Sequence, residues 1–414
     1  MSKRKSNLNN KSDLLALAVT FILVLAFFVS FSFVTNHFIT DSNPYNTYEI
    51  QAQSWLDGRV DVDNREWLEL ATYNGKYYVS FPPLPSVILL PFVAVFGSGC
   101  DNYIAFLALL LGVFFCFKLS RKFGLSPEFS ALVTSALYLG TNMRQITSDA
   151  WVWFFAQNLA FLFTILSFYC GKIKKKGLSM LFLACAVGCR PFALIYLPLI
   201  LLIILDGMEE KSLIVKFKKL VFEKIWVYIP AFLIVLFYCI YNYVRFGNIF
   251  EFGHNYLPEF LNSEDGQFSL NYFIKNLPCL FRLPTVSQGK ITFPQFDGMS
   301  IFLVIPFFIT YPLSLIVSFI RDKKIEYKSY HILGSVLILF HIFILLCHKT
   351  MGGAHFGNRY IMDTVPCLFV LSVMSFKQSF KSKNRLTTAF NVVCAVVFVV
   401  GVLINFIGTA EFYN

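Results

Sequence analysis

The chain between residues 14 and 55 decides the class of fold. Residues 14–33 read LLALAVTFILVLAFFVSFSF, and residues 37–55, which follow almost at once, read HFITDSNPYNTYEIQAQSW. The first run is long enough to cross a bilayer, too long for the apolar part of a signal peptide, and lacks a small-residue cleavage site. It therefore predicts a retained membrane-spanning helix, which releases the chain into a polar loop that extends to residue 100.

Composition agrees with a membrane protein throughout. Of the 414 residues, 57% are hydrophobic and only 14% are charged, whereas soluble domains carry about 25% charged residues. The net charge of +11 would suit a nucleic-acid surface, but the basic residues lie in short clusters between apolar segments. We therefore expect membrane lipids, and no nucleic acid, among the partners.

The basic clusters predict the topology. Six of them are found, at residues 3–11, 118–122, 172–176, 211–224, 321–328 and 377–385. If all six are cytoplasmic, as the positive-inside rule expects, an even number of crossings separates each from the next. Residues 82–97, broken by two prolines, then form an interfacial helix on the outer face. Residues 178–206 form two crossings that meet at Arg190.

The predicted fold is an all-α polytopic membrane protein of about eleven transmembrane helices. The predicted crossings are residues 13–36, 101–119, 128–143, 151–170, 177–189, 191–206, 225–243, 299–319, 330–347, 360–376 and 387–408. This arrangement predicts one membrane domain, 1–414, with a cytoplasmic amino end and an extracytoplasmic carboxyl end. The only long outer loops are 37–100, with its juxtamembrane helices, and 244–298, so we expect the chemistry on the outer face.

Asp41 is the candidate catalytic residue of the first loop. It lies just beyond the first span, and the Asn43-Pro44 pair that follows is a helix-start signal for residues 45–56. A carboxylate at the mouth of that helix is placed to take a proton from an incoming hydroxyl group. The alternative is that Asp41 only caps or solvates the loop.

Arg190 is the candidate anion-binding residue. A basic residue at membrane depth is costly unless it faces a cavity, a partner or a phosphate. Arg245, Lys76 and Arg359 add cations near the outer leaflet, where an arriving phosphate would meet them. A snorkelling or salt-bridged arginine is the alternative.

Two further patterns have competing interpretations. Asp61 and Asp63 alternate as divalent-cation ligands do, but alternation also suits a solvated turn, and no third ligand is visible, so we expect no metal and no other cofactor. Most of the ten cysteines lie inside apolar segments without metal-ligand spacing, which favours small buried hydrophobic residues.

Several segments, taken in order, resemble one family. They are Asp41 after the first span, Tyr77-Tyr78-Val79-Ser80-Phe81-Pro82-Pro83, Thr147-Ser148-Asp149-Ala150-Trp151, Arg190, Arg245-Phe246-Gly247-Asn248 and Phe356-Gly357-Asn358-Arg359-Tyr360. Together they resemble the GT-C superfamily, the multi-span glycosyltransferases that use polyprenyl-phosphate sugars. Protein O-mannosyltransferases and the aminoarabinose transferase of lipid A are members.

The resemblance implies a role for particular residues. Asp41 would be the catalytic base, Asp149 a supporting acid and Arg190 a ligand of the donor phosphate, while Lys76 falls near another donor-phosphate position. Relatives often carry a second acid beside the first, but here Ser42 follows Asp41, so Glu49 is the alternative base. The remaining expected pocket and phosphate residues are Tyr45, Tyr48, Tyr78, His254, His355, Arg245 and Arg359.

The expected function is that of an inverting glycosyltransferase in the bacterial plasma membrane. It would move a sugar from a polyprenyl-phosphate donor to a hydroxyl group of a glycan or lipid acceptor, with Asp41 and Arg190 lining one cavity. A lipid or oligosaccharide transporter or flippase is the alternative, as is a polysaccharide polymerase. A transporter usually carries midplane charges and interrupted repeats, which the sequence does not show.

Overall fold

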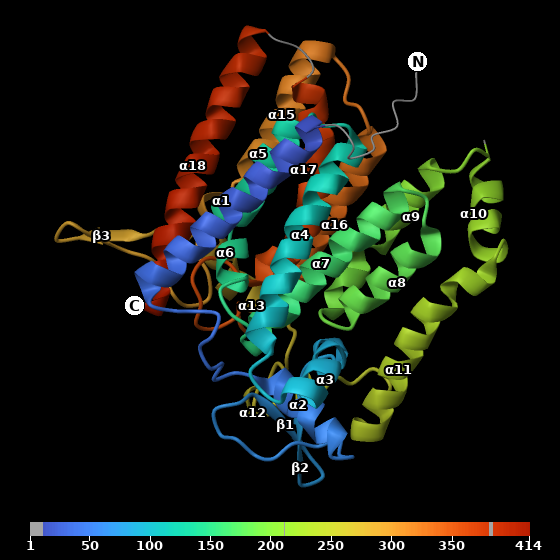
Figure 1. The fold of residues 1–414 in the computed structure, drawn as a ribbon, viewed down its shortest axis with the longest axis vertical. Helices are drawn as coiled ribbons and strands as arrows, with labels where there is room; N and C mark the ends of the chain where they lie inside the picture. The colour runs from blue at the N-terminus through green and yellow to red at the C-terminus, as the bar shows by residue number, and fades with distance from the viewer. Residues whose placement is uncertain (1–10, 211, 381–383) are drawn as a thin grey trace.

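The structure is a computed structural model that describes residues 11–210, 212–380 and 384–414. A bundle of α-helices runs between two ends of the molecule (Figure 1). The bundle helices are α1 (Lys11–Thr35), α4 (Asp101–Phe123), α5 (Pro127–Gly140), α7 (Val152–Lys172), α8 (Lys176–Val187), α9 (Leu197–Asp206), α11 (Ile229–Phe246), α15 (Phe307–Asp322), α16 (Lys328–Leu346), α17 (Val365–Ser379) and α18 (Arg385–Tyr413).

Shorter elements join these helices. The α-helices among them are α2 (Thr47–Leu56), α3 (Leu84–Phe96), α6 (Met143–Ile146), α10 (Leu213–Phe222), α12 (Pro258–Leu261), α13 (Leu270–Asn276) and α14 (Ile301–Val304). The 3-10 helices are η1 (Pro191–Tyr196), η2 (Ile225–Tyr228), η3 (His254–Tyr256), η4 (Leu277–Leu280) and η5 (Tyr360–Thr364). Two antiparallel hairpins complete the fold, β1 (Leu70–Tyr73) with β2 (Lys76–Val79) and β3 (Thr285–Ser287) with β4 (Lys290–Thr292).

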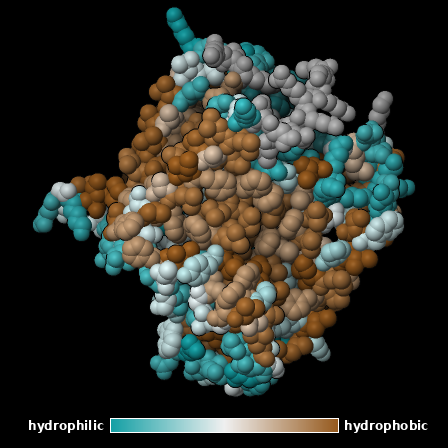
Figure 2. All heavy atoms as spheres, viewed as in Figure 1, coloured by the Kyte–Doolittle hydropathy of each residue, from teal (hydrophilic) through white to brown (hydrophobic). Residues whose placement is uncertain are grey.

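The bundle has the character of a membrane domain. Among the described helices, seven are long and apolar enough to cross a bilayer: α1, α4, α7, α11 with η2, α16, α17 with η5, and α18. The shorter α5, α8, α9 with η1, and α15 lie among them, so each predicted crossing coincides with a helix. Figure 2 shows an apolar belt of side chains between hydrophilic ends. The predicted all-α polytopic membrane architecture is confirmed.

The two ends of the bundle differ in charge. We call the end that carries residues 36–100 and 247–300 the loop end, and the opposite one the basic end (Figure 1). The described residues of the predicted basic clusters all lie at the basic end. Residues 3–10, Lys211, Lys381 and Lys383, which belong to the same clusters, lie outside the described residues.

The first loop forms a compact layer beneath the bundle at the loop end. The Asn43 Oδ1 atom accepts a hydrogen bond from the Tyr45 N–H at 2.9 Å, and this turn leads into α2. The helix α3 packs against α2 at the loop end instead of crossing the bundle (Figure 1). Prolines at Pro85 and Pro91 and its short length, Leu84–Phe96, explain why residues 82–97 do not form a long crossing helix.

The predicted break at Arg190 is present. The helix α8 ends at Val187, Arg190 is extended with φ −142° and ψ 107°, and Pro191 opens η1. A Cβ atom at Gly188 would lie 1.9 Å from the Tyr238 Oη atom, so α11 can approach the break this closely only at a glycine.

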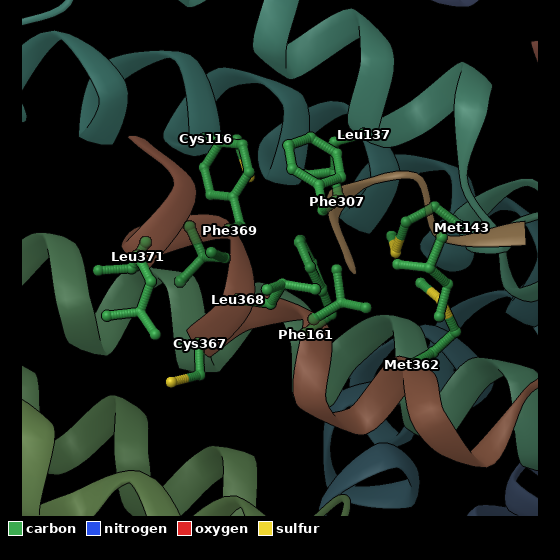
Figure 3. Close-up of a cluster of buried hydrophobic side chains, with 14 of the residues drawn as sticks. Cys116, Leu137, Met143, Phe161, Phe307, Met362, Cys367, Leu368, Phe369 and Leu371 are labelled. Carbon is green, nitrogen blue, oxygen red and sulfur yellow. The ribbon is translucent and has the colours of Figure 1, made fainter. Parts of the chain in front are cut away.

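Close-packed apolar side chains fill the bundle. Figure 3 shows Phe307 and Phe369 beside Leu137, with Cys116 and Cys367 buried in the same cluster. These two cysteines are free thiols without a metal-ligand neighbour among the described residues, and they pack as apolar side chains. The bundle core therefore holds the loop end rigidly, and the functional candidates lie there.

Candidate functional site

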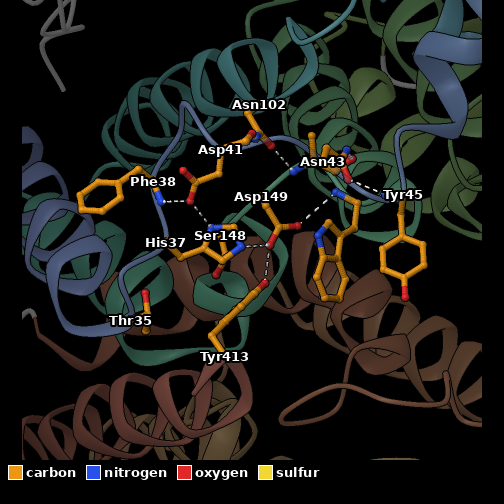
Figure 4. A network of polar contacts seen from close by, with 12 residues as sticks. Thr35, His37, Phe38, Asp41, Asn43, Tyr45, Asn102, Ser148, Asp149 and Tyr413 are labelled. Atoms are coloured by element: carbon orange, nitrogen blue, oxygen red, sulfur yellow. Dashed lines mark hydrogen bonds and ion pairs between the residues drawn. The ribbon is translucent and has the colours of Figure 1, made fainter.

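Asp41 lies at the surface of the loop end, directly after α1. Its Oδ2 atom accepts a hydrogen bond from the Phe38 N–H at 2.7 Å, and its backbone carbonyl accepts one from Asn102 Nδ2 at 3.0 Å. The side chain remains 42% exposed, with His37 Nδ1 at 3.7 Å (Figure 4). Asp41 is thus oriented by the backbone and still open to an incoming group.

Asp149 lies behind Asp41 and is buried, with 1% of its side chain exposed. Its Oδ2 atom accepts a hydrogen bond from Tyr413 Oη at 2.5 Å, and its Oδ1 atom accepts one from the Trp151 N–H at 3.1 Å. Burial raises the pKa of Asp149 to about 6, although both hydrogen bonds oppose that shift. The structure therefore brings Asp41 and Asp149 together on either side of His37 (Figure 4).

Glu49, the alternative base, has a structural role. Its carboxylate is buried and accepts hydrogen bonds from the backbone N–H groups of Gly99, Cys100 and Asp101 at 2.7–3.0 Å. These are the unpaired donors at the start of α4, which a carboxylate satisfies well. Since its oxygens are occupied there, Glu49 is poorly placed to receive a proton from a substrate.

Arg190 lines a cavity of about 210 Å³ at the loop end. The walls are mostly aromatic and apolar, and the polar lining residues near the arginine include His254, His348 and Tyr360. Burial lowers the pKa of His348 to about 3 and lowers that of His254, so both imidazoles are neutral at neutral pH. Arg190 is thus the cation among the residues that line this cavity.

The charge of Arg190 is compensated within the bundle. Asp363, on η5, accepts hydrogen bonds at its Oδ2 atom from Arg190 Nη2 at 2.7 Å and Nε at 3.0 Å. Gln157 Nε2 donates to the other carboxylate oxygen at 2.8 Å. The alternative of a salt-bridged arginine is therefore the one that the structure shows, although Arg190 still lines the cavity.

Arg359 also lies near the Tyr360 ring. The guanidinium carbons of Arg190 and Arg359 lie 5.5 Å and 5.0 Å from the centre of that ring. Arg359 is buried and donates from Nη2 to the Gly352 carbonyl at 2.7 Å, while its Nε and Nη1 atoms have no hydrogen-bond partner among the described residues. Arg359 therefore has two donors that an arriving anion could use, and no acid in the described part of the chain pairs with it.

His355 packs near Gly352, as Arg359 does. A Cβ atom at Gly352, where φ is 110°, would meet Arg359 Nη2 at 3.0 Å and His355 Cε1 at 3.2 Å. Both side chains therefore pack on a glycine that leaves them room. His355 is fully buried, and burial lowers its pKa to about 3. Neither residue is among those lining the Arg190 cavity.

Aromatic side chains bridge Arg359 and the first loop. The Trp153 ring lies 5.7 Å from the Arg359 guanidinium and 5.0 Å from the Tyr45 ring. Its Nε1 atom donates a hydrogen bond to Glu69 Oε2 at 2.9 Å. Tyr45 also lies 5.0 Å from Trp151, which follows Asp149 in the chain. We call Tyr45, Trp151 and Trp153 the aromatic bridge.

The expectation that Asp41 and Arg190 line one cavity is wrong. Asp41 is not among the residues lining the Arg190 cavity. It is held at the end of α1 by Phe38 and Asn102, whereas Arg190 is turned into the bundle by Asp363. The two lie at the same end of the molecule, with the aromatic bridge and Arg359 between their neighbourhoods.

Other predicted residues have packing or surface roles. Lys76 lies at the turn of the first hairpin, with Nζ 3.1 Å from Asp61. Arg245 is buried and donates to the Val79 carbonyl at 2.7 Å, which ties α11 to β2. Tyr78 packs 5.3 Å from Phe246. None of the three predicted residues lines the Arg190 cavity.

The remaining predictions concern the loop and the cavity walls. Asp63 pairs with Arg59 at 2.9 Å while Asp61 pairs with Lys76, so the two carboxylates have separate partners. Tyr48 is buried 6.3 Å from Phe81, a lining residue of the cavity, and its hydroxyl has no partner among the described residues. His254 lines the cavity.

Four residues of the site were not predicted. They are His37, Asp363, Tyr360 and Tyr413. Asp363 was detectable, because a lone acid in an apolar segment calls for a partner and Arg190 was available. The other three carry no comparable signal, since tyrosines are common at membrane interfaces.

No protein-family model matches the chain, and no curated protein matches it in sequence. Among solved structures, it is similar to the Archaeoglobus fulgidus oligosaccharyltransferase in the apo form, with a TM-score of 0.54 and 11% identity over 99% of this chain. The chain spans 57% of that protein's length. This similarity shows that the chain shares the fold of the corresponding part of that protein.

The structure is also similar to ArnT from Cupriavidus metallidurans. For ArnT bound to undecaprenyl phosphate, the TM-score is 0.47 with 12% identity, over 97% of this chain and 75% of that one. For ArnT in the apo state, the TM-score is 0.44 with 13% identity over the same shares.

Proposed function

We propose that the protein is a membrane glycosyltransferase that moves a sugar from a polyprenyl-phosphate donor to a hydroxyl group of a glycan or lipid acceptor on the extracytoplasmic face. One observation carries the proposal. At a single end of a GT-C-like bundle, an open carboxylate and a buried arginine with free donors lie on either side of an aromatic bridge.

The arginines suit the phosphate of a lipid donor. Asp363 occupies the Nε and Nη2 atoms of Arg190, whereas the Nε and Nη1 atoms of the buried Arg359 have no partner among the described residues and are free for an anion. Charge-assisted hydrogen bonds from a guanidinium fork are the usual way to hold a phosphate. The apolar walls of the neighbouring cavity, which include Phe192 and Phe268, suit the first isoprene units behind that phosphate.

The aromatic bridge suits the sugar. Tyr45 and Trp153 present large apolar rings with a polar edge, a combination that packs on a sugar ring and still leaves its hydroxyl groups hydrogen-bonded. A sugar lying there would extend from the phosphate at Arg359 toward the first loop. Its anomeric carbon would then be open to attack from the side of Asp41.

The proposed reaction is a single displacement. The acceptor hydroxyl loses its proton to the Asp41 carboxylate, and its oxygen bonds to the anomeric carbon. The bond from that carbon to the phosphate oxygen breaks, and the electron pair leaves with the polyprenyl phosphate. Arg359 stabilises the charge that develops on the phosphate. Attack opposite the leaving group inverts the anomeric configuration.

Two other acids are competitors for the role of base. Glu49 is occupied by the start of α4. Glu69 is exposed and bonds Trp153, and its charge reaches Arg359. We assign the base to Asp41 because its carboxylate has one hydrogen-bond donor and an imidazole to balance it, whereas Glu69 positions the aromatic bridge.

A lipid flippase is the second candidate, and the Arg190–Asp363 pair favours it. An ionisable pair inside the bundle is a feature of substrate pathways in transporters. The two functions differ in their products: a flippase moves a polyprenyl-phosphate sugar unchanged, and a transferase consumes it.

Mass spectrometry distinguishes the transferase from the flippase. Cells that lack the protein are expected to accumulate one polyprenyl-phosphate sugar and to lose one sugar from an envelope glycan or lipid. Purified full-length protein with that donor should release polyprenyl phosphate, and the Asp41→Asn variant should be slower by about 10²–10⁴-fold, the usual contribution of a general base.

The matched control is Asp63→Asn, an exposed carboxylate of the same loop that pairs only with Arg59 among the described residues. It should leave turnover unchanged. Wild-type turnover in Asp41→Asn with a loss in Glu69→Gln would move the base to Glu69. Transport of the donor without release of polyprenyl phosphate would replace the transferase with the flippase.

A further inference from the structure

We propose that His37 is a positioning residue for this reaction, which holds the Asp41 carboxylate by facing it and the buried Asp149 carboxylate at the same time. The inference rests on the proposed function, in which Asp41 is the base. It assigns a role to a histidine that touches neither the cavity nor the aromatic bridge directly.

The two ring nitrogens of His37 face two different acids (Figure 4). Nδ1 lies 3.7 Å from Asp41 Oδ2, and Nε2 lies 4.0 Å from Asp149 Oδ2. A protonated imidazole carries a donor on each nitrogen, so only the imidazolium suits both contacts. Asp41 and Asp149 come from distant segments, and His37 is the side chain between them.

The backbone and Tyr413 hold the ring in this place. Asn36 has a positive φ of 52°, which ends α1, and the His37 N–H then bonds the Ser32 carbonyl at 3.1 Å. The Tyr413 ring packs edge-on at 4.9 Å and 76°. The His37 side chain is 27% exposed, so it can still exchange protons with water.

The charge of Asp149 depends on its surroundings. Tyr413 on α18 and the Trp151 N–H donate to it, and the charges of His37 and of Arg144 on α6 also lower its pKa. Arg144 is buried over the Phe31 ring at 3.9 Å and bonds Ser148, and Asp101 on α4 is a further buried acid near Asp149. With a pKa raised to about 6 by burial, Asp149 is ionised above that pH and neutral below it.

The ionisation state of Asp149 affects Asp41 through His37, which faces both carboxylates. Above pH 6 Asp149 is ionised, and both carboxylates act on the His37 ring, which leaves the Asp41 carboxylate available as a base. Below pH 6 Asp149 is neutral and Asp41 alone faces the ring as a carboxylate, so a closer contact with His37 weakens it as a base. Activity should therefore fall as the pH drops through about 6.

Two measurements on the full-length protein in nanodiscs test the role. The first is the nitrogen NMR titration of its ring-labelled histidines, with His37→Gln used to assign the signal among the six. The His37 signal should change as Asp149 ionises, so Asp149→Asn should alter its pH profile. Tyr413→Phe should move the part of the profile that depends on Asp149 to higher pH, because the tyrosine hydrogen bond stabilises the Asp149 carboxylate.

The second measurement is turnover of the polyprenyl-phosphate sugar. His37→Gln should lower kcat about tenfold, leave KM for the donor unchanged and abolish the inflection near pH 6, since one charged contact amounts to roughly 1–2 kcal/mol. Added imidazole should restore part of the loss in His37→Gly. The histidine control is His331→Gln in α16, which removes a hydrogen bond to Tyr311 in α15 and should leave the pH profile as it is.

The outcomes are distinct. A His37 pH profile that is the same in the wild type and in Asp149→Asn, or an unchanged kcat in His37→Gln, overturns the positioning role. A wild-type protein with a coupled His37 signal and no transfer from any polyprenyl-phosphate sugar overturns the proposed function, and leaves the His37–Asp149 coupling as a property of the loop end.

Discussion

At the scale of single residues, Arg190 and Arg359 differ more than their symmetric packing on Tyr360 suggests. Both guanidinium groups lie within 6 Å of that ring. Asp363 neutralises only Arg190, whereas two nitrogens of Arg359 lack partners among the described residues. A buried guanidinium with unsatisfied donors is costly, and an arriving phosphate would relieve that cost.

Arg359→Lys should therefore weaken donor binding while keeping the positive charge. A lysine cannot offer a planar fork, and loss of one charge-assisted hydrogen bond of about 1.5–3 kcal/mol predicts a rise in donor KM of roughly 10- to 100-fold. Initial rates against donor concentration measure this. Lys349→Gln is the control, because its Nζ atom bonds the Glu259 carbonyl on the exposed surface. An unchanged KM in Arg359→Lys would remove Arg359 from the phosphate site.

Residue-level prediction from the sequence singles out residues that are exceptional for their segments. Arg190 in an apolar run and Asp41 at the end of a span are such residues, because of their costs and positions. The role of Glu49 in the fold could not be predicted, since its partners are backbone N–H groups 50–52 positions away in the chain. His37 was not predicted, because a histidine at a helix end has no special signal in the sequence. Only the fold shows that two carboxylates lie around it.

At the scale of elements, the Arg190–Asp363 pair fastens the break between α8 and η1 to η5. The backbone at Arg190 is extended, and its N–H still bonds the Ala186 carbonyl at 2.8 Å. The double contact to Asp363 and the Gln157 hydrogen bond supply the link from outside. The pair thus fixes the wall of the cavity, which both elements line through Arg190 and Tyr360.

Breaking this pair from one side should be more harmful than removing it altogether. Arg190→Gln or Asp363→Asn leaves one buried charge without its partner, a loss of about 3–5 kcal/mol in the free energy of unfolding. The double variant leaves two amides that can bond each other, and should recover most of that stability. Thermal unfolding in detergent measures the stability of the two single variants and of the double variant. Additive losses in the double variant would show that the two residues act separately.

At the scale of the whole molecule, the sequence was sufficient for the architecture. Each predicted crossing coincides with a helix because apolar length and basic clusters are properties of local segments. The site is assembled from the first loop, η5, the α8–η1 break and the end of α18, which only packing brings together. That packing has no local signature, so its partners could not be paired from the sequence.

The same charge pattern predicts which way the molecule faces. The loop end should be extracytoplasmic, since the described basic clusters lie at the other end. Labelling of single introduced cysteines measures this orientation, because the native thiols are buried apart from the half-buried Cys239. In intact cells a membrane-impermeant maleimide should label Asp63→Cys, where the side chain is 75% exposed. It should label Lys324→Cys, at the basic end, only after permeabilisation.

The unsubstituted protein sets the background for this labelling. If only Lys324→Cys were labelled in intact cells, the protein would have the opposite orientation in the membrane. The candidate site would then face the cytoplasm. A donor could then reach Arg359 only from the inner leaflet, and an envelope acceptor could not reach Asp41 at all. The orientation therefore decides where the acceptor must be sought, before any sugar is identified.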